Sequence, residues 1–298
     1  MKKTGVFYHE ICGKKAYKIF VYDTGVEEGF MALKRGKLFD EPNIFFYESE
    51  PAPDELILKV HTRKMVEEVK QSGYFDTSSY SAGGNIAAFD QVLSGRIDNA
   101  LVFTGDGGHH SGRDYFGGGC FFNTEAIAVY YARKKFGISK FAIIDTDSHH
   151  GNGTMDIFRD DDDLLYICFC NTYNGEFGTG KMSETKICLP HGSSNEEEIK
   201  NVKEGIQGRV KEFKPELIYW MSGLDTHVES YGTRCLTEQC YPRLAQIFKD
   251  SAEEVCNGNL VAKACCNGPA HVAAFVMPRI LDRLAGLDKY HLQGENYD

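Results

Sequence analysis

Five short apolar runs, separated by longer stretches with helical spacing, constrain the fold of this chain more than any other feature. Each run is apolar nearly throughout, which is typical of a parallel strand covered on both faces. Alternation of such strands with helices predicts an α/β fold, with an open and mostly parallel sheet between two helical layers. The expected strands are residues 100–104, 141–145, 164–170, 217–222 and 260–265.

The stretches between the runs predict helices. Thr124 is expected to be the N-cap of one helix, and Pro269 suits the first position of the last, where a missing N–H costs nothing. The 298 residues contain no linker-like segment and no repeat, so we predict a single domain over residues 1–298. The expected helices are residues 55–71, 85–93, 124–136, 196–213, 237–256 and 270–287.

The charge balance is acidic, with 43 acidic and 33 basic side chains and a formal net charge of -10. A nucleic-acid-binding protein needs a basic stripe, so we expect no nucleic-acid partner. The balance is compatible with cationic substrates such as polyamines or lysine side chains. Two lysines near the N-terminus precede no continuous apolar stretch, so we expect neither a secretory signal nor a membrane span.

Ten cysteines are spread through the chain, and they do not form the disulfide pattern of a small secreted protein. We therefore predict reduced thiols and a cytoplasmic location. The pairs Cys168/Cys170 and Cys265/Cys266 are too closely spaced for a zinc knuckle, and we interpret them as small core residues.

Carboxylates and imidazoles follow the apolar run at 141–144. Such groups are costly to bury without a partner, and a cation would supply one. Alternate side chains of an extended segment share a face, so we expect Asp145, Asp147 and His149 to point one way, and Ser148 and His150 the other. Asp147 and His149 are then candidate metal ligands, and Asp145 is expected to orient a neighbouring group.

Two more strand ends add polar residues to this set. Asp225 follows the run at 217–222 and would complete a three-ligand site with open positions, which suits catalytic Zn²⁺, although Fe²⁺ or Co²⁺ would also fit. His109 and His110 follow the run at 100–104 after a glycine turn. One of them would act as a general base beside the metal and the other as an acid or electrostatic helper.

The order of these motifs resembles that of the histone deacetylase and acetylpolyamine amidohydrolase family over residues 56–287. The resemblance rests on three blocks in chain order. They are Gly108-His109-His110 before Cys120-Phe121-Phe122-Asn123, then the segment from Asp145 through Asp147 and His149 to Thr154, and last Gly223-Leu224-Asp225-Thr226-His227.

This resemblance implies an arginase/deacetylase-like fold and hydrolysis of an acylated amine. It implies Zn²⁺ on Asp147, His149 and Asp225, and a catalytic pair of His109, supported by Asp145, and His110, supported by Asn152. It also implies a structural K⁺ beside Asp145 and Asp147. Asp76 matches a rim aspartate that grips substrate, although a simple turn residue would look the same.

The chain departs from the family where a Gly-Gly-Tyr segment usually follows the last core strand. The tyrosine, which donates a hydrogen bond to the developing oxyanion, is absent from the stretch 265–271. His271 and Tyr231 are the candidate replacements. In the channel, Gly119 stands where many relatives have an aromatic wall, which predicts a wider tunnel, while Phe177 is expected to keep the opposite wall. Cys170 also replaces a histidine that is common in relatives.

The leading hypothesis is therefore a metal-dependent amide hydrolase with a peptidyl or small-molecule acylated amine as substrate. A catalytically weak or inactive protein that binds metal and acylated ligands or partners is the alternative, because the usual tyrosine is missing. A ureohydrolase of the related arginase fold is the third reading, although the single Asp-x-His block favours one metal ion. The acyl group, the amine and the oligomeric state do not follow from the sequence.

Overall fold

The core of the molecule is one parallel sheet. The structure, a computed structural model, describes residues 1–17, 25–170, 183–233, 235–265 and 268–291. Over these ranges eight strands pair in the order β2-β1-β3-β8-β7-β4-β5-β6, and every pair is parallel. The strands are β1 (Thr4–Tyr8), β2 (Ile44–Glu48), β3 (Asn99–Thr104), β4 (Phe141–Asp145), β5 (Leu164–Phe169), β6 (Lys186–Leu189), β7 (Leu217–Gly223) and β8 (Leu260–Cys265).

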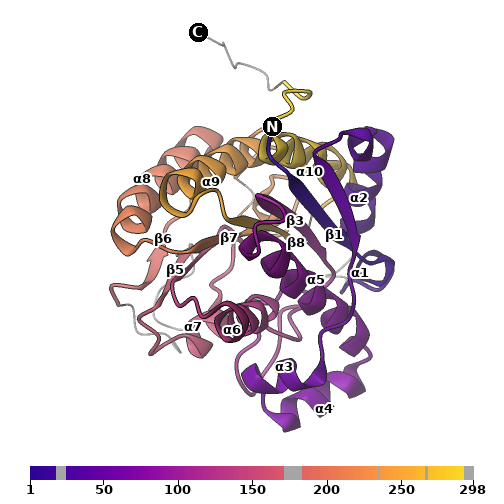
Figure 1. The fold of residues 1–298 in the computed structure, drawn as a ribbon, viewed down its shortest axis with the longest axis vertical. Coiled ribbons are helices and arrows are strands. Elements are labelled where there is room, and N and C mark those ends of the chain that lie inside the picture. The colour runs from indigo at the N-terminus through magenta and orange to yellow at the C-terminus, as the bar shows by residue number, and fades with distance from the viewer. Residues whose placement is uncertain (18–24, 171–182, 234, 266–267, 292–298) are drawn as a thin grey trace.

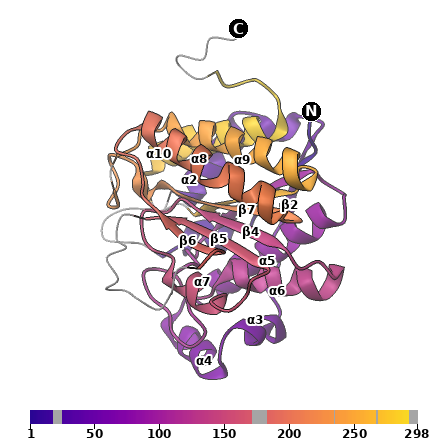
Figure 2. The same ribbon diagram turned by 90° about the vertical axis from the view of Figure 1, so that its left-hand side faces the viewer.

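Helices cover both faces of the sheet, and the two views in Figures 1 and 2 show the layers. One face packs against α2, α8, α9 and α10, and the other packs against α5 and α6, with α3, α4 and α7 beside them. The expected three-layer α/β architecture is confirmed, and the sheet is parallel throughout the described pairs. The helices are α1 (Glu10–Lys14), α2 (Val26–Arg35), α3 (Asp54–Val60), α4 (Arg63–Ser72), α5 (Phe75–Leu93), α6 (Thr124–Phe136), α7 (Asn152–Ile157), α8 (Asn195–Phe213), α9 (Cys240–Cys256) and α10 (Ala270–Ala285), with short 3-10 turns η1 (Leu38–Asp40) and η2 (Leu224–Thr226).

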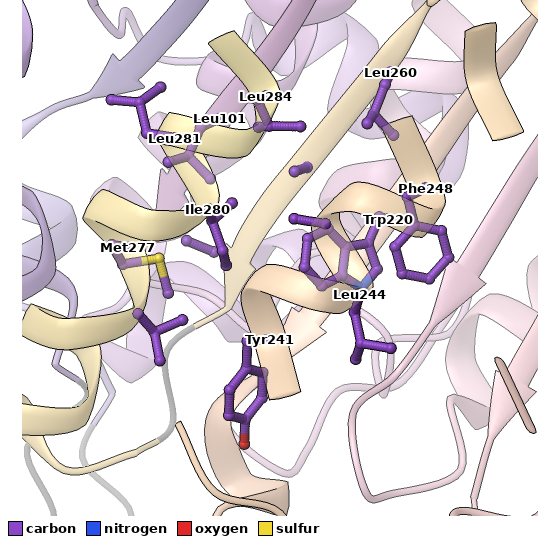
Figure 3. Packing of buried hydrophobic residues seen from close by; sticks show 14 of the residues in the cluster. Leu101, Trp220, Tyr241, Leu244, Phe248, Leu260, Met277, Ile280, Leu281 and Leu284 are labelled. Carbon is purple, nitrogen blue, oxygen red and sulfur yellow. The ribbon is translucent and has the colours of Figure 1, made fainter. Parts of the chain in front are cut away.

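The core on the α9/α10 side is dense and aromatic (Figure 3). Trp220 of β7 stacks on Phe248 of α9 with ring centroids 4.8 Å apart, and Leu260, Ile280 and Leu284 pack in the same cluster. The central strands β3, β4, β5, β7 and β8 are buried along their full length. This explains why their sequences are apolar without alternation.

Several boundaries differ from the expected ones. The helix expected at 55–71 is two helices, because the chain is extended at His61 and Thr62 and the Thr62 hydroxyl accepts a hydrogen bond from the Met65 N–H to cap α4. The N-cap of α6 is Asn123, not Thr124, since the Asn123 side chain accepts from the Ala126 N–H. Pro269 is itself the N-cap of α10.

The parallel arrangement places the carboxyl ends of β3, β4 and β7 at one edge of the sheet, where ligand sites of such folds lie. Strand β7 is the direct neighbour of β4, and β8 separates β7 from β3. Among the helices of the described ranges, we find none with the length and apolar character that crossing a bilayer requires. The single domain over residues 1–298 and the cytoplasmic location stay predictions.

Candidate active site

Two carboxylates and one imidazole meet where β4 and β7 end. The Nδ1 atom of His149 lies 3.1 Å from Oδ1 of Asp147 and 2.9 Å from Oδ2 of Asp225. One ligand atom from each residue falls within 4.8 Å of the others. Gly223 permits this approach, because a Cβ there would lie 2.7 Å from an oxygen of each carboxylate.

The donor set fits a divalent cation. Asp147 and Asp225 are almost fully buried, and two carboxylates in one buried site need positive charge. Burial would raise the pKa of Asp147, yet His109 and His149 hold that pKa well below its usual range, whereas burial and then the Asp147 charge raise the pKa of Asp225. Hydrogen bonds to both carboxylates raise the pKa of His149 to about 11. Three protein ligands, here two carboxylate oxygens and one imidazole nitrogen, match the ligand set of catalytic zinc sites.

Ser148 lies on the side of the carboxylates, contrary to the expected alternation. Its Oγ donates a hydrogen bond to Oδ2 of Asp225, and its backbone N–H donates to the same carboxylate at 3.2 Å. The chain leaves extended geometry after β4 ends at Asp145, so the period of two no longer applies. Ser148 thus fixes Asp225, a role that alternation from the strand does not predict.

His109 is held by a carboxylate, as the resemblance implies. Its Nδ1 lies 2.8 Å from Oδ2 of Asp145, and that oxygen also accepts a hydrogen bond of 2.7 Å from the Tyr166 hydroxyl. Burial opposes a charge on His109, but Asp145 and Asp147 outweigh it and raise the pKa of His109 to about 9. Tyr166 on β5 was not predicted as a site residue, because it lies within an apolar run that is typical of a buried core strand.

His110 is held by a neutral amide. Its Nδ1 lies 2.7 Å from Oδ1 of Asn152, and the Asn152 amide nitrogen donates to the Tyr115 hydroxyl at 3.3 Å. Burial, followed by the charge of His109, lowers the pKa of His110 to about 4. The ring centroids of His109 and His110 lie 4.1 Å apart, so two histidines with different hydrogen-bond acceptors occupy one site.

A buried ion pair supports the Asp147 backbone. His191 Nε2 lies 3.1 Å from the Asp147 carbonyl oxygen, and its Nδ1 lies 3.0 Å from Oε1 of Glu198. Burial lowers the pKa of His191, but Glu198 more than offsets this and raises it. Sequence reasoning did not select this pair, although a histidine followed seven residues later by a glutamate in the first turn of an expected helix was the available signal.

A cavity of about 350 Å³ opens beside the histidines. Gly118 belongs to its wall and has φ +58°, and a Cβ there would lie 2.6 Å from the His110 ring. Gly119 does not widen this cavity as expected, because the Tyr17 ring packs against it: a Cβ at Gly119 would lie 2.8 Å from that ring. The lining residues are His110, Tyr115, Phe116, Gly117, Gly118, His149, His150 and Asn152.

Two further channel candidates were Asp76 and Phe177. Asp76 is exposed in the first turn of α5, so it is a helix residue and not a turn residue, and it does not line the cavity. Phe177 lies outside the described residues.

The two candidate oxyanion donors have different surroundings. The Tyr231 ring stacks on His149 with centroids 5.8 Å apart, and burial, then the charges of Asp147 and Asp225, raise the pKa of its hydroxyl. His271 lies on the surface, where Nε2 pairs with Glu229 at 3.0 Å and its side chain is 67% exposed. This position gives no support to His271 as a donor to a buried oxyanion.

Known proteins that are similar to this chain are deacetylases and related amidohydrolases. Residues 71–264 match the model of the histone deacetylase domain. A probable deacetylase from Archaeoglobus fulgidus is 33% identical over 256 residues, covering 77% of this chain and 71% of the relative. A histone deacetylase-like amidohydrolase from Pseudomonas aeruginosa is 30% identical over 238 residues, covering 71% of this chain and 63% of the relative.

A polyamine deacetylase from Rattus norvegicus is 29% identical over 210 residues, covering 65% of this chain and 35% of the relative. The chain thus spans less than two thirds of the length of the bacterial amidohydrolase and of the rat protein. The matched domain model covers most of the sheet, from α4 to β8. The chain therefore belongs to the histone deacetylase family and is a hydrolase of the deacetylase type.

Proposed function

We propose that this chain hydrolyses the amide bond of an acylated amine with the help of one divalent metal ion. Asp147, His149 and Asp225 would hold that ion, and His109 and His110 would move protons. The observation that carries the proposal is the meeting of three ligand atoms within 4.8 Å beside two histidines that have separate hydrogen-bond acceptors.

The metal is Zn²⁺ in this proposal, since two oxygen ligands and one nitrogen ligand with open positions suit catalytic zinc, and Fe²⁺ or Co²⁺ also fit. When bound, such an ion supplies a Lewis acid for the acyl carbonyl and lowers the pKa of water. The K⁺ expected beside Asp145 and Asp147 stays a prediction from the family resemblance.

The hydrogen-bond acceptors of His109 and His110 determine which histidine takes up a proton and which one donates a proton in this proposal. With Nδ1–H of His110 donated to the neutral amide of Asn152, Nε2 of that ring carries a lone pair and can take a proton from water at the cavity. The carboxylate of Asp145 favours the imidazolium form of His109, which can then protonate the leaving amine. Asp145 and Asn152 are positioning residues for these transfers.

Tyr231 is the proposed donor to the developing oxyanion. Its hydroxyl stays protonated because burial and two nearby carboxylates disfavour the anion, and its ring is stacked on a metal ligand. It would take the part of the tyrosine that the family usually carries after the last core strand.

The cavity suggests a slender acyl chain bound between rings. Tyr115 and Phe116 supply apolar surface, while the adjoining glycines add no side chain. An acylated polyamine, an acyl-lysine or a small N-acyl amine has the required shape, and the net charge of -10 suits a cationic remainder. The names of the relatives, amidohydrolase and polyamine deacetylase, support this class.

Release of carboxylic acid from acylated amines tests the proposal. Zinc-loaded protein should hydrolyse at least one of a panel of acetylpolyamines, acyl-lysine peptides of several acyl lengths and small N-acyl amines. Asp147→Ala should abolish turnover, and His271→Ala should leave it unchanged. Ligand binding without turnover of any panel member would instead favour a binding protein and would overturn the proposal.

A further inference from the structure

Three thiols gather on one face of the sheet beside the candidate active site. Cys168 and Cys170 are two residues apart at the end of β5, so their side chains share a face. The β5–β6 register pairs Cys168 with Cys188 of β6. The Cys168 thiol lies within hydrogen-bonding reach of both other thiols, and all three pack with the same core cluster.

An imidazole completes this group. His150, from the segment after β4, directs Nδ1 at Cys170 Sγ, 3.6 Å away, and at Cys188 Sγ, 3.5 Å away. The ligand atoms of these three residues all lie within 4.8 Å of one another. His150 and Cys170 are buried, whereas Cys188 is partly exposed, and His150 also lines the cavity. An ion therefore has a route to the group.

The separations match those of a tetrahedral zinc site. With Zn–S of about 2.3 Å and Zn–N of about 2.0–2.1 Å, tetrahedral geometry separates a nitrogen and a sulfur ligand by about 3.5–3.6 Å. Both measured N···S distances fall in that range. The side chains need little rearrangement to enclose an ion, and each thiol that binds would release its proton to solvent.

We propose that His150, Cys170 and Cys188 form a second metal site that binds a thiophilic divalent cation, Zn²⁺, and that the Cys168 thiol, which is not among the three ligand atoms within 4.8 Å of one another, shifts to fill the fourth position. The sulfur ligands favour a softer cation than the Asp147/His149/Asp225 set does. Neighbouring residues, His149 and His150, serve one site each. A ureohydrolase centre with two metal ions would not use these thiols. Thiol ligands therefore distinguish the proposed second site from such a centre. The site is independent of the proposed amide hydrolysis.

Cobalt substitution tests this site without an activity assay. Co²⁺ bound by thiolates absorbs in the near ultraviolet through sulfur-to-metal charge transfer, and the Asp147/His149/Asp225 set contains no sulfur. Reduced, metal-free protein should bind two Co²⁺ per chain and develop that band. Asp147→Ala should remove one equivalent and leave the band, so failure of the proposed function and failure of this site are distinguishable.

Cysteine variants assign the band to residues. Cys170→Ser and Cys188→Ser should each lower binding to one Co²⁺ and abolish or strongly weaken the band. Cys168→Ser should weaken it by about a third, since one of three sulfur ligands is lost. The matched control is Cys256→Ser, a buried thiol on α9 that donates to the Asn259 carbonyl oxygen, which should leave the band unchanged.

Two outcomes would overturn the proposal, and the first needs no variant. In the first, wild-type protein that is kept fully reduced, with its thiols counted by a chromogenic reagent, saturates at one Co²⁺ and shows no charge-transfer band. That result would mean that the group is a hydrogen-bonded thiol cluster and not a metal site. A band of undiminished intensity in a folded Cys170→Ser/Cys188→Ser double variant would place the sulfur ligands elsewhere.

Discussion

The Asn123 backbone N–H donates a 2.9 Å hydrogen bond to Nε2 of His61, whose Nδ1 lies 2.9 Å from the Gly112 carbonyl oxygen. The imidazole is therefore neutral, with its proton on Nδ1, and it ties the α3–α4 junction to both ends of the segment that carries the cavity wall. Burial lowers the pKa of His61 to about 4. Protonating Nε2 would break the bond to Asn123.

Acid should destabilise the fold through His61. In the unfolded state His61 takes up a proton near pH 6.5, and in the folded state only near pH 4. The free energy of unfolding therefore falls as the pH drops through this window, by about 3 kcal/mol at the lower end. His61→Gln should be less stable at pH 7 and should show a flatter dependence between pH 6.5 and 4 in urea unfolding. His271→Gln, at an exposed histidine, is the control, and an unchanged slope in His61→Gln would contradict the assignment.

Lys263 and Glu125 form a fully buried ion pair 3.4 Å apart. The Lys263 ammonium also donates to the Gly107 carbonyl oxygen at 2.6 Å. Lys263→Met should destabilise the protein by about 3–5 kcal/mol, because it leaves a buried carboxylate without its cation. The double variant Lys263→Met/Glu125→Gln should lose less than the sum of the single losses. Additive free energies of unfolding would show that the pair is not coupled.

Tyr231→Phe should lower kcat on the best substrate by on the order of 100- to 1000-fold, since one preorganised oxyanion donor is lost. KM and metal content should change little, because the ring remains stacked on His149. Steady-state kinetics with metal analysis of the same samples checks this. A Tyr231→Phe enzyme with unchanged kcat would remove Tyr231 from the proposed mechanism.

His191 and Glu198 should tune metal affinity without touching the ion. Glu198→Gln removes the charge that pairs with His191, and His191 in turn contacts the Asp147 carbonyl oxygen. Metal binding should weaken by about 10- to 100-fold, the usual effect of losing such indirect support. Competition with a chelator measures this loss. Glu197→Gln, one residue away and bonded to Ser193 at the surface, should retain wild-type affinity.

The central strands were predictable because burial on both faces leaves an unmistakable apolar run. Strands β4 and β8 have the predicted bounds. Strands β1, β2 and β6 were missed. Strands β2 and β6 are the outermost strands of the sheet, and their exposed or half-exposed residues interrupt the apolar pattern. The first half of α5 was missed because its serines and glycines resemble a turn. Close packing requires the glycine at position 83, since a Cβ there would lie 1.7 Å from the Glu50 carbonyl oxygen.

The meeting of Asp147, His149 and Asp225 could be predicted because parallel strands bring their carboxyl ends to the same side of the sheet. Contacts between loops did not follow in the same way. Tyr17 against Gly119 and His150 against Cys188 join segments whose approach is set by tertiary packing and not by any local period. Cys168, Cys170 and Cys265, interpreted as small core residues, are buried as expected, and Cys266 lies outside the described residues. The grouping of Cys168 and Cys170 with a histidine depends on strand register.

Because the eight described strands run in one direction, the connections that lead from helices into β4, β7 and β8 lie at the edge opposite the candidate active site. These connections turn at Gly137, Lys214 and Asn257, each in the left-handed conformation that ends its helix. An affinity tag, a fluorophore or an inserted peptide attached there would leave the chemistry of the other edge undisturbed. This is the side by which the protein can be anchored to a solid support with its cavity facing the solution.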